Sequence, residues 1–194
     1  MIFRNKNTIP KILYCVILVL LIYSCKETYM PKPHGYFRIS FPEKQYNSYE
    51  SDFPYTFQFP DYSKIELIDA DSCWINITFP DYNAKIYITY RTIDNNLSTL
   101  LEQSRKFSYN HTSKADEISE SLTINWNKRV FGTQYEIKGD VASSLQFYLT
   151  DSLQHFMRAS LYFNERPNQD SIAPVLNFIK KDVEKLIESF EWRN

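Results

Sequence analysis

The sequence predicts an α+β domain in which two helices flank an antiparallel β-sheet. Three observations support this fold class. Many segments alternate between apolar and polar residues, as half-buried strands do. Two other segments repeat their apolar residues every three or four positions, which is typical of helices. Short turn signals separate neighbouring strands, and short turns favour hairpins and therefore antiparallel pairing.

Alternating segments occupy the first half of the region that follows the N-terminus. They are "YFRISF" (36–41), "YTFQF" (55–59), "KIELI" (64–68), "CWINITF" (73–79) and "KIYITYRT" (85–92). The last two predict a hairpin across "PDYNA", because Pro ends strands and Asp and Asn favour turns. Cys73 begins the fourth segment, and we interpret it as a small hydrophobe on the inner face of that strand.

The period then changes to that of a helix. Asn95 or Asn96 is a suitable N-cap for a helix that begins near Leu97 and ends around residues 110–114. The side chains expected on its inner face are Leu97, Leu100, Leu101, Ser104, Phe107 and His111. Strand character returns from about residue 119 as a predicted meander. Its segments are 121–126, 129–138, 143–150 and 156–163, with turns at 127–128, 139–140 and 151–152.

A second helix closes the chain. Ser171 or Asp170 is expected to cap it, with Pro174 in the first turn. The apolar stripe expected to face the core is Ile172, Val175, Leu176, Ile179, Val183, Leu186, Ile187 and Phe190. The polar residues expected outside are Lys180, Lys181, Asp182, Glu184, Lys185 and Glu188. In outline this order of elements is similar to the Mog1/PsbP-type fold.

The N-terminus has the pattern of a bacterial lipoprotein signal. Three basic residues precede an eleven-residue apolar run (12–22), which is shorter than the roughly 20 residues of a membrane span. Residues 22–25, "IYSC", have the layout of a lipobox. We therefore predict a signal peptide over 1–24, a lipid anchor at Cys25 with a Pro-rich tether over 25–35, and one domain over 36–194. An ordinary signal peptide and an uncleaved anchor are the alternatives.

Charge and motif content exclude several classes of protein. Removing residues 1–24 takes away three basic residues and no acid, which leaves 19 basic and 23 acidic residues and argues against nucleic-acid binding. Three glycines in the whole chain leave no phosphate-binding loop. His34, His111 and His155 are isolated, so we expect no metal site and no cofactor. Cys73 is the single cysteine after Cys25, so no internal disulfide is expected.

Catalytic residues are not expected either. The acidic pairs Asp69/Asp71 and Glu117/Glu120 lie in predicted loops or strand edges, where solvated carboxylates are the ordinary case. We therefore expect that the protein is not an enzyme, although an envelope hydrolase with acids assembled in space stays an alternative. Aromatic residues are abundant, and "PYTFQFPDY" and "LQFYLT" are candidates for a glycan or lipid pocket. The favoured interpretation is that these aromatics fill the sheet.

Four longer pieces carry a resemblance to a known family. They are "PKPHGYFRISFP" (31–42), "QFYLTDS" (146–152), "FMRASLYFNERPNQDSIAPV" (156–175) and "FIKKDVEKLIESFEW" (178–192). With the lipobox cysteine, they resemble the GldD gliding-motility lipoproteins of Bacteroidota. The resemblance covers nearly the whole mature chain. It transfers one functional position, the lipidated Cys25, and no catalytic residue.

The resemblance implies a lipid-anchored accessory protein of the gliding machinery, which is linked to the type IX secretion system. Its partners would be other gliding lipoproteins and components of the motor or the secretion apparatus. A periplasmic glycan- or lipid-binding module is the alternative. Lys26 and Glu27 differ from an aspartate inner-membrane retention signal, so we expect the outer membrane, with the domain in the periplasm. In this group Asp-Ser-hydrophobic triplets can carry O-glycans. Ser152 and Ser171 fit that pattern, and both also fit a turn or a cap.

Overall fold

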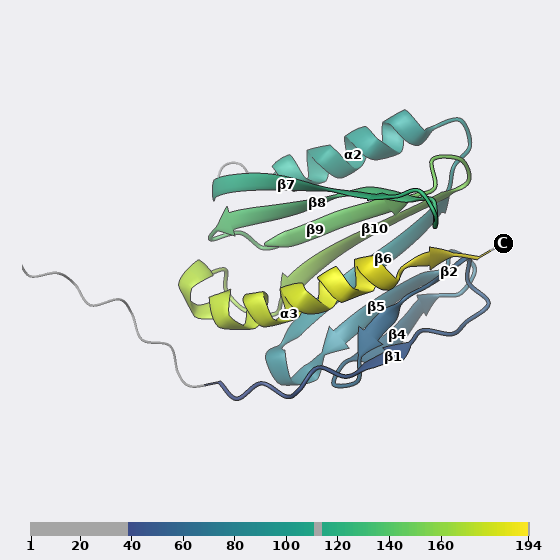
Figure 1. The fold of residues 1–194 in the computed structure, drawn as a ribbon. Helices are drawn as coiled ribbons and strands as arrows, with labels where there is room; N and C mark the ends of the chain where they lie inside the picture. The colour runs from purple at the N-terminus through teal and green to yellow at the C-terminus, as the bar shows by residue number, and fades with distance from the viewer. Residues whose placement is uncertain (1–38, 111–113, 194) are drawn as a thin grey trace, which may run out of the picture. The chain divides into compact units, whose positions relative to one another are not determined.

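The computed structural model describes residues 39–110 and 114–193. The chain divides into two units, Met1–Gly35 and Tyr36–Asn194, and every described residue belongs to the second. A seven-stranded antiparallel sheet forms its centre, in the order β4-β5-β6-β10-β9-β8-β7 (Figure 1). The strands are β4 (Lys64–Asp69), β5 (Trp74–Phe79), β6 (Ala84–Thr92), β7 (Ala115–Asn125), β8 (Val130–Gly139), β9 (Leu145–Thr150) and β10 (His155–Phe163).

Two meanders build this sheet and meet along β6 and β10. Ser160 of β10 lies opposite Tyr87 of β6, and Met157 lies opposite Tyr90. The predicted hairpin across residues 80–84 is confirmed, with a short 3-10 turn (Pro80–Tyr82) and Asn83 in the left-handed region. The predicted α+β fold with an antiparallel sheet is therefore confirmed.

The predictions for the N-terminal strands need correction. Residues 39–41 form no strand, and residues 36–38 lie outside the described part. Phe41 instead stacks on Phe178 at 4.3 Å between ring centroids, and Pro42 has no N–H to donate to a ladder. The predicted strand 55–59 is split between two small sheets. There β1 (Tyr46–Ser48) pairs with β3 (Gln58–Pro60), and β2 (Tyr55–Thr56) pairs with β11 (Glu191–Trp192).

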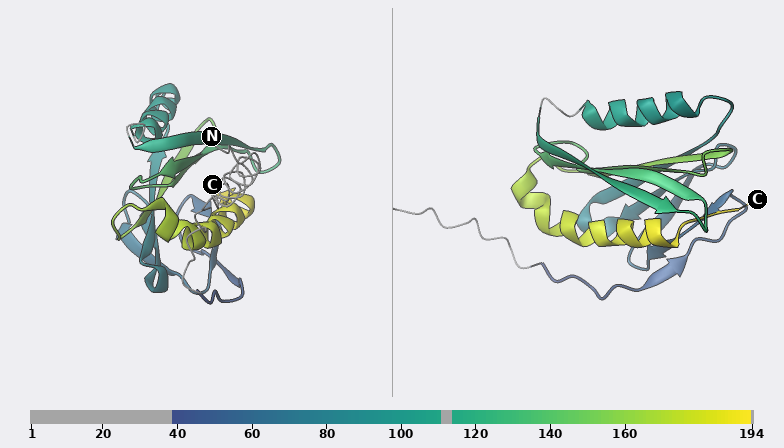
Figure 2. Two further views of the ribbon diagram at one scale, coloured as in Figure 1. Left: turned by 90° about the vertical axis from the view of Figure 1, so that its left-hand side faces the viewer. Right: turned by 45° about the horizontal axis from the view of Figure 1, so that its top comes forward.

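Helix α3 (Gln169–Ser189) covers one face of the sheet, which curves around it (Figures 1 and 2). Its buried residues Ile179, Val183 and Leu186 pack into the main core, as the apolar stripe predicted. The strands contribute to this core Ile75, Ile77, Phe79, Ile86, Ile88, Leu145, Phe147, Leu149, Met157 and Leu161. The cap is Asn168 rather than Ser171 or Asp170, because the Asn168 side chain accepts the Ser171 N–H at 3.1 Å.

Asp182 lies inside the protein, so the prediction that it covers the outside of the second helix is wrong. Its side chain is 1% exposed and accepts hydrogen bonds from Lys44 Nζ at 2.6 Å, Tyr46 at 2.9 Å and Tyr62 at 2.6 Å. Lys44 Nζ also lies 3.7 Å from the centre of the Phe178 ring. Lys44 before β1, Tyr46 in β1 and Tyr62 after β3 thus supply the partners that a buried carboxylate requires.

Helix α2 (Leu97–Tyr109) lies on the opposite face of the sheet from α3 (Figure 1). It buries only Leu100, Ser104 and Ser108, whereas Phe107, expected on the inner face, is 50% exposed. Asn96 is the N-cap residue, but its side chain accepts the Asp94 N–H instead of a helical N–H. Because α2 is short and buries few residues, it leaves parts of this face uncovered.

Candidate functional site

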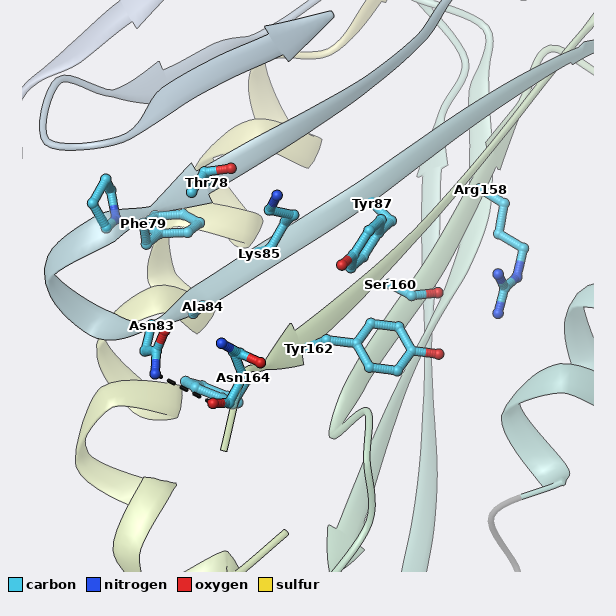
Figure 3. Close-up of a pocket in the computed structure, with 12 residues that line it drawn as sticks. Thr78, Phe79, Asn83, Ala84, Lys85, Tyr87, Arg158, Ser160, Tyr162 and Asn164 are labelled. Atoms are coloured by element: carbon cyan, nitrogen blue, oxygen red, sulfur yellow. Dashed lines mark hydrogen bonds between the residues drawn. The ribbon is translucent and has the colours of Figure 1, made fainter. Parts of the chain in front are cut away.

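A groove lined by both polar and apolar side chains occupies the uncovered part of the α2 face, over β5, β6 and β10. Its volume is about 870 Å³, and Thr78, Lys85, Tyr87, Arg158, Ser160 and Tyr162 are among the residues that line it (Figure 3). Strand alternation explains this set. Ile86, Ile88 and Leu161 point into the core, so their neighbours Lys85, Tyr87 and Tyr162 point outward.

Two tyrosines form the aromatic part of the groove. The rings of Tyr87 and Tyr162 lie 5.5 Å apart at 85°, an edge-to-face pair, and they are 46% and 36% exposed. Ser160 lies beside the two tyrosines, on the side toward Arg158 (Figure 3), and is only 3% exposed. Its hydroxyl has no hydrogen-bond partner among the described residues. An unmatched buried hydroxyl is uncommon, and it calls for an explanation.

The charges that line the groove are positive. Lys85 Nζ is paired with Glu66 of β4 at 2.8 Å. Among the described residues, no carboxylate pairs with Arg158; its guanidinium donates to Gln146 Oε1 at 2.5 Å and lies 4.8 Å from the centre of the Phe107 ring. Burial lowers the pKa of Arg158. The guanidinium therefore carries a charge that no acid in contact compensates.

A second surface feature is an apolar patch at the tips of the β7–β8 and β9–β10 hairpins. We define the hairpin-tip patch as Leu122, Ile124, Trp126, Phe131 and Leu153. Four of these are highly exposed: Leu122 by 75%, Ile124 by 62%, Trp126 by 77% and Leu153 by 60%. Trp126 and Phe131 form an edge-to-face pair at 4.9 Å and, with Leu153, border a hollow of about 490 Å³.

The candidate residues of the N-terminal region cannot be compared with the structure. Cys25, the tether, His34 and His111 lie outside the described residues. His155 begins β10, one residue before the predicted strand 156–163, and its Nδ1 lies 2.7 Å from the Tyr90 hydroxyl while its ring stacks on Trp192. In the described part of the chain, no three His, Cys, Asp or Glu side chains gather in a way that could hold a metal ion.

Cys73 precedes β5 instead of lying on that strand, so its predicted position on the inner face is wrong. Its φ of 56° belongs to a turn, and its side chain packs half-buried against the edge of the core. Burial raises the pKa of its thiol. This environment is that of an unreactive thiol, because the thiolate is the nucleophile.

The acidic pairs do not assemble into a site. Asp69 accepts the N–H groups of Asp71 and Ser72 in a turn. Glu117 is paired with Lys138 at 2.8 Å, whereas Glu120 accepts a hydrogen bond from Tyr109. The carboxylates of Asp69, Glu117 and Glu120 therefore each have a local partner of their own.

The two triplet serines are both exposed. Ser152 has a φ of 67° and belongs to the β9–β10 turn, whose Asp151 Oδ1 accepts the N–H groups of residues 153–155. Ser171 lies in the first turn of α3, where its hydroxyl donates to the Asn168 carbonyl. The turn and cap interpretations agree with both positions.

The aromatic segments named from the sequence are mostly part of the core. Tyr55, Phe57 and Phe147 are buried, which agrees with aromatics that fill the sheet. Sequence reasoning missed the exposed pair, Tyr87 and Tyr162. The sequence does contain an indication of this pair, because both tyrosines occupy the outward-facing positions of alternating strands, where an aromatic side chain is not needed for the core.

A comparison with models of protein families shows to which family the chain belongs. The model described as gliding motility lipoprotein GldD matches residues 26–192. The chain belongs to this family. GldD membership makes it a gliding-motility lipoprotein and a membrane-anchored envelope protein, as the resemblance implied. A search of curated proteins found no match. None of the helices in the described residues combines the length and apolarity that crossing a membrane requires.

Proposed function

We propose that this GldD-family protein is a lipid-anchored accessory component of the gliding machinery that acts through protein–protein contacts and is linked to type IX secretion. Its partners are other gliding lipoproteins and components of the motor or the secretion apparatus. The observation that carries the contact mechanism is the hairpin-tip patch. Four large apolar side chains, each at least 60% exposed, are gathered at one end of the sheet. Such patches mark interaction surfaces in soluble domains.

The patch continues into an unpaired strand edge. Leu122 and Ile124 belong to β7, which is the last strand of the sheet in the described part of the chain. An edge strand offers its free N–H and C=O groups to an added strand, and neighbouring apolar side chains give such pairing its specificity. The partner surface that fits is an extended segment with apolar side chains on one face.

Anchoring supports this role. We propose that Cys25 carries the lipid, that residues 1–24 are removed, and that the domain faces the periplasm from the outer membrane. Confinement to a membrane raises the effective concentration of the domain near anchored partners, so a contact of modest affinity suffices. The mass of the chain purified from membranes tests the anchor. A mature chain in the soluble fraction with an unmodified Cys25 would contradict it.

We further propose that this protein has no enzymatic activity. The separate partners of Asp69, Glu117 and Glu120 support that view, as does the stacked, hydrogen-bonded His155. The groove of Tyr87 and Tyr162 favours a second function, that of a ligand-binding module. The groove and the hairpin-tip patch share no residue, so the two functions are compatible.

Site-specific photo-crosslinking in living cells tests the contact mechanism. A photoreactive amino acid replaces Leu122 or Trp126, and the matched control position is Glu184, which is exposed on α3. We expect the patch positions to capture a gliding lipoprotein or a type IX secretion component that the control position does not. Equal capture at Glu184, or no capture at either patch position, would overturn the proposed contact.

A further inference from the structure

The groove on the α2 face combines features that suit a sugar ring. Two exposed tyrosine faces border it, and the C–H faces of a pyranose pack well on aromatic rings. Thr78, Ser160 and the amide side chains of Asn83 and Asn164 provide polar groups for hydroxyls. A lipid tail is a poor match, because the groove is open to solvent and a tail in it would lie next to the cationic side chains of Lys85 and Arg158.

The charged residues that line the groove indicate which class of sugar it would bind. The lining includes Lys85 and Arg158 and no Asp or Glu. Glu66 compensates Lys85, whereas the Arg158 guanidinium contacts an amide oxygen and an aromatic ring and has no carboxylate partner within the described part of the chain. The planar fork of an arginine matches a carboxylate in a bidentate manner. This local positive charge belongs to a chain whose net charge is −1, so it is a property of the groove and not of the whole surface.

We propose that the groove binds an acidic saccharide, with the sugar ring against Tyr87 and Tyr162 and its carboxylate at Arg158. A sugar hydroxyl placed beside the tyrosine pair, at the Ser160 position of the groove, supplies the partner that Ser160 lacks. The ligand is a carboxylate-bearing glycan of the cell envelope. This binding goes beyond the proposed protein contacts and does not depend on them.

Calorimetric titration of the full, lipidated chain in detergent micelles tests the proposal. The probe is a tetramer of galacturonic acid. Its matched control is the same tetramer with the carboxylates reduced to hydroxymethyl groups. We expect the acidic tetramer to bind about tenfold more tightly than the reduced one, as a charge-assisted contact of ordinary strength would give. Equal affinity for the two tetramers, or binding of neither, would overturn the proposal.

Variants separate the contributions of the groove residues. Arg158→Gln is expected to weaken binding of the acidic tetramer about tenfold and to leave the reduced tetramer unchanged. Tyr87→Ala and Tyr162→Ala should weaken both tetramers. The matched control is Lys181→Gln, which removes an exposed charge on α3 and should not alter binding. If Arg158→Gln does not fold, Arg158→Lys keeps the charge, loses the fork and is expected to bind more weakly.

Ser160→Ala distinguishes a ligand contact from a structural role. Because the hydroxyl has no partner among the described residues, its removal should leave the unfolding midpoint unchanged and weaken saccharide binding several-fold. A lowered midpoint with unchanged binding would contradict the role of Ser160. Competition by inorganic phosphate or by anionic phospholipid vesicles as effective as the acidic tetramer would show an anion or lipid-headgroup site and would overturn the saccharide.

Discussion

Lys44 Nζ lies 2.6 Å from Asp182 Oδ1 and joins the segment before β1 to the middle of α3. The pair is asymmetric, because the Lys44 side chain is 22% exposed and the Asp182 side chain only 1%. Tyr46 and Tyr62 complete the shell of the carboxylate. Burial, followed by the hydrogen bond to Asp182, raises the pKa of both tyrosine hydroxyls, so they act as donors throughout the physiological range.

Removing one member of this pair should cost more stability than an exposed ion pair would. Lys44→Ala leaves the Asp182 carboxylate buried without its cation, and we expect the free energy of unfolding to fall by about 3 kcal/mol. Urea denaturation measures it. Glu184 is exposed on the same helix, so Glu184→Ala should change the free energy of unfolding by less than about 0.5 kcal/mol. Similar values for the two variants would show that the buried network contributes little.

The turn between β9 and β10 should make stability depend on pH. Burial alone disfavours the charged form of Asp151, but the N–H groups of residues 153–155 donate to it and outweigh burial, so its pKa is lowered. A lowered folded-state pKa gives stability that is present above the ordinary carboxyl pKa and is lost as pH falls through the folded value.

We therefore expect Asp151→Ala to lower the free energy of unfolding by about 1–2 kcal/mol at pH 7, as loss of a capping acceptor does. This difference from the wild type should shrink in acid. Urea denaturation at pH 7, 5 and 3 measures it. Asp151→Asn keeps an acceptor oxygen and does not titrate, so its own stability should lack this step. A difference that does not change with pH would contradict the assignment.

Gly132 is required by the close approach of β9. A Cβ atom at this position would lie 2.1 Å from the Tyr148 carbonyl oxygen and 2.8 Å from Leu149 Cδ2. Because the first of these atoms is backbone, Gly132→Ala must displace a strand, and we expect a loss of about 3 kcal/mol or more. Thermal unfolding followed by circular dichroism measures it. Thr133→Ala, which removes the 2.9 Å bond to Tyr148 and one buried methyl group, should cost about 1–2 kcal/mol.

The hairpin-tip patch should matter for function and not for folding. Leu122 and Trp126 are 75% and 77% exposed, so replacing both with Ser should change the free energy of unfolding by less than about 0.5 kcal/mol. We expect cells that carry this double variant to lose spreading on a surface at unchanged protein level. Ile68→Ser, an exposed apolar residue on β4, is the matched control and should spread normally. Normal spreading by the double variant would exclude the patch as the working contact.

Local pattern predicted most of the sheet because its strands are paired by short hairpins. Alternation is strict in β5, β6 and β10, so their inner residues could be named from the sequence alone. The alternation pattern gave a wrong prediction where an alternating segment packs against a helix instead of pairing with a strand. Residues 39–41 show this, since Phe41 stacks on Phe178, 137 positions further along the chain. The prediction that Asp182 lies outside the helix was wrong because its three partners, Lys44, Tyr46 and Tyr62, are far from α3 in the sequence.

The candidate site was less visible in the sequence than the fold. Tyr87 and Tyr162 come from strands that are neighbours only through the β6–β10 pairing, which no turn signal indicates. The unmatched Ser160 hydroxyl is likewise a product of packing. The hairpin-tip patch joins Trp126 to Leu153 across two separate turns. The sequence does indicate, from alternation, on which face of its strand each aromatic residue lies.

The fastening of residues 41–46 to α3 has a mechanical consequence for a membrane-anchored protein that belongs to a motility machine. A pulling force applied through the N-terminal side of the domain reaches the Phe41–Phe178 stack and the Lys44–Asp182 pair before it reaches β4. The load therefore passes into the long core helix, which spreads it over the buried face of the sheet. The edge strand β4, whose pairing with β5 could be broken one hydrogen bond at a time, therefore does not receive the load first.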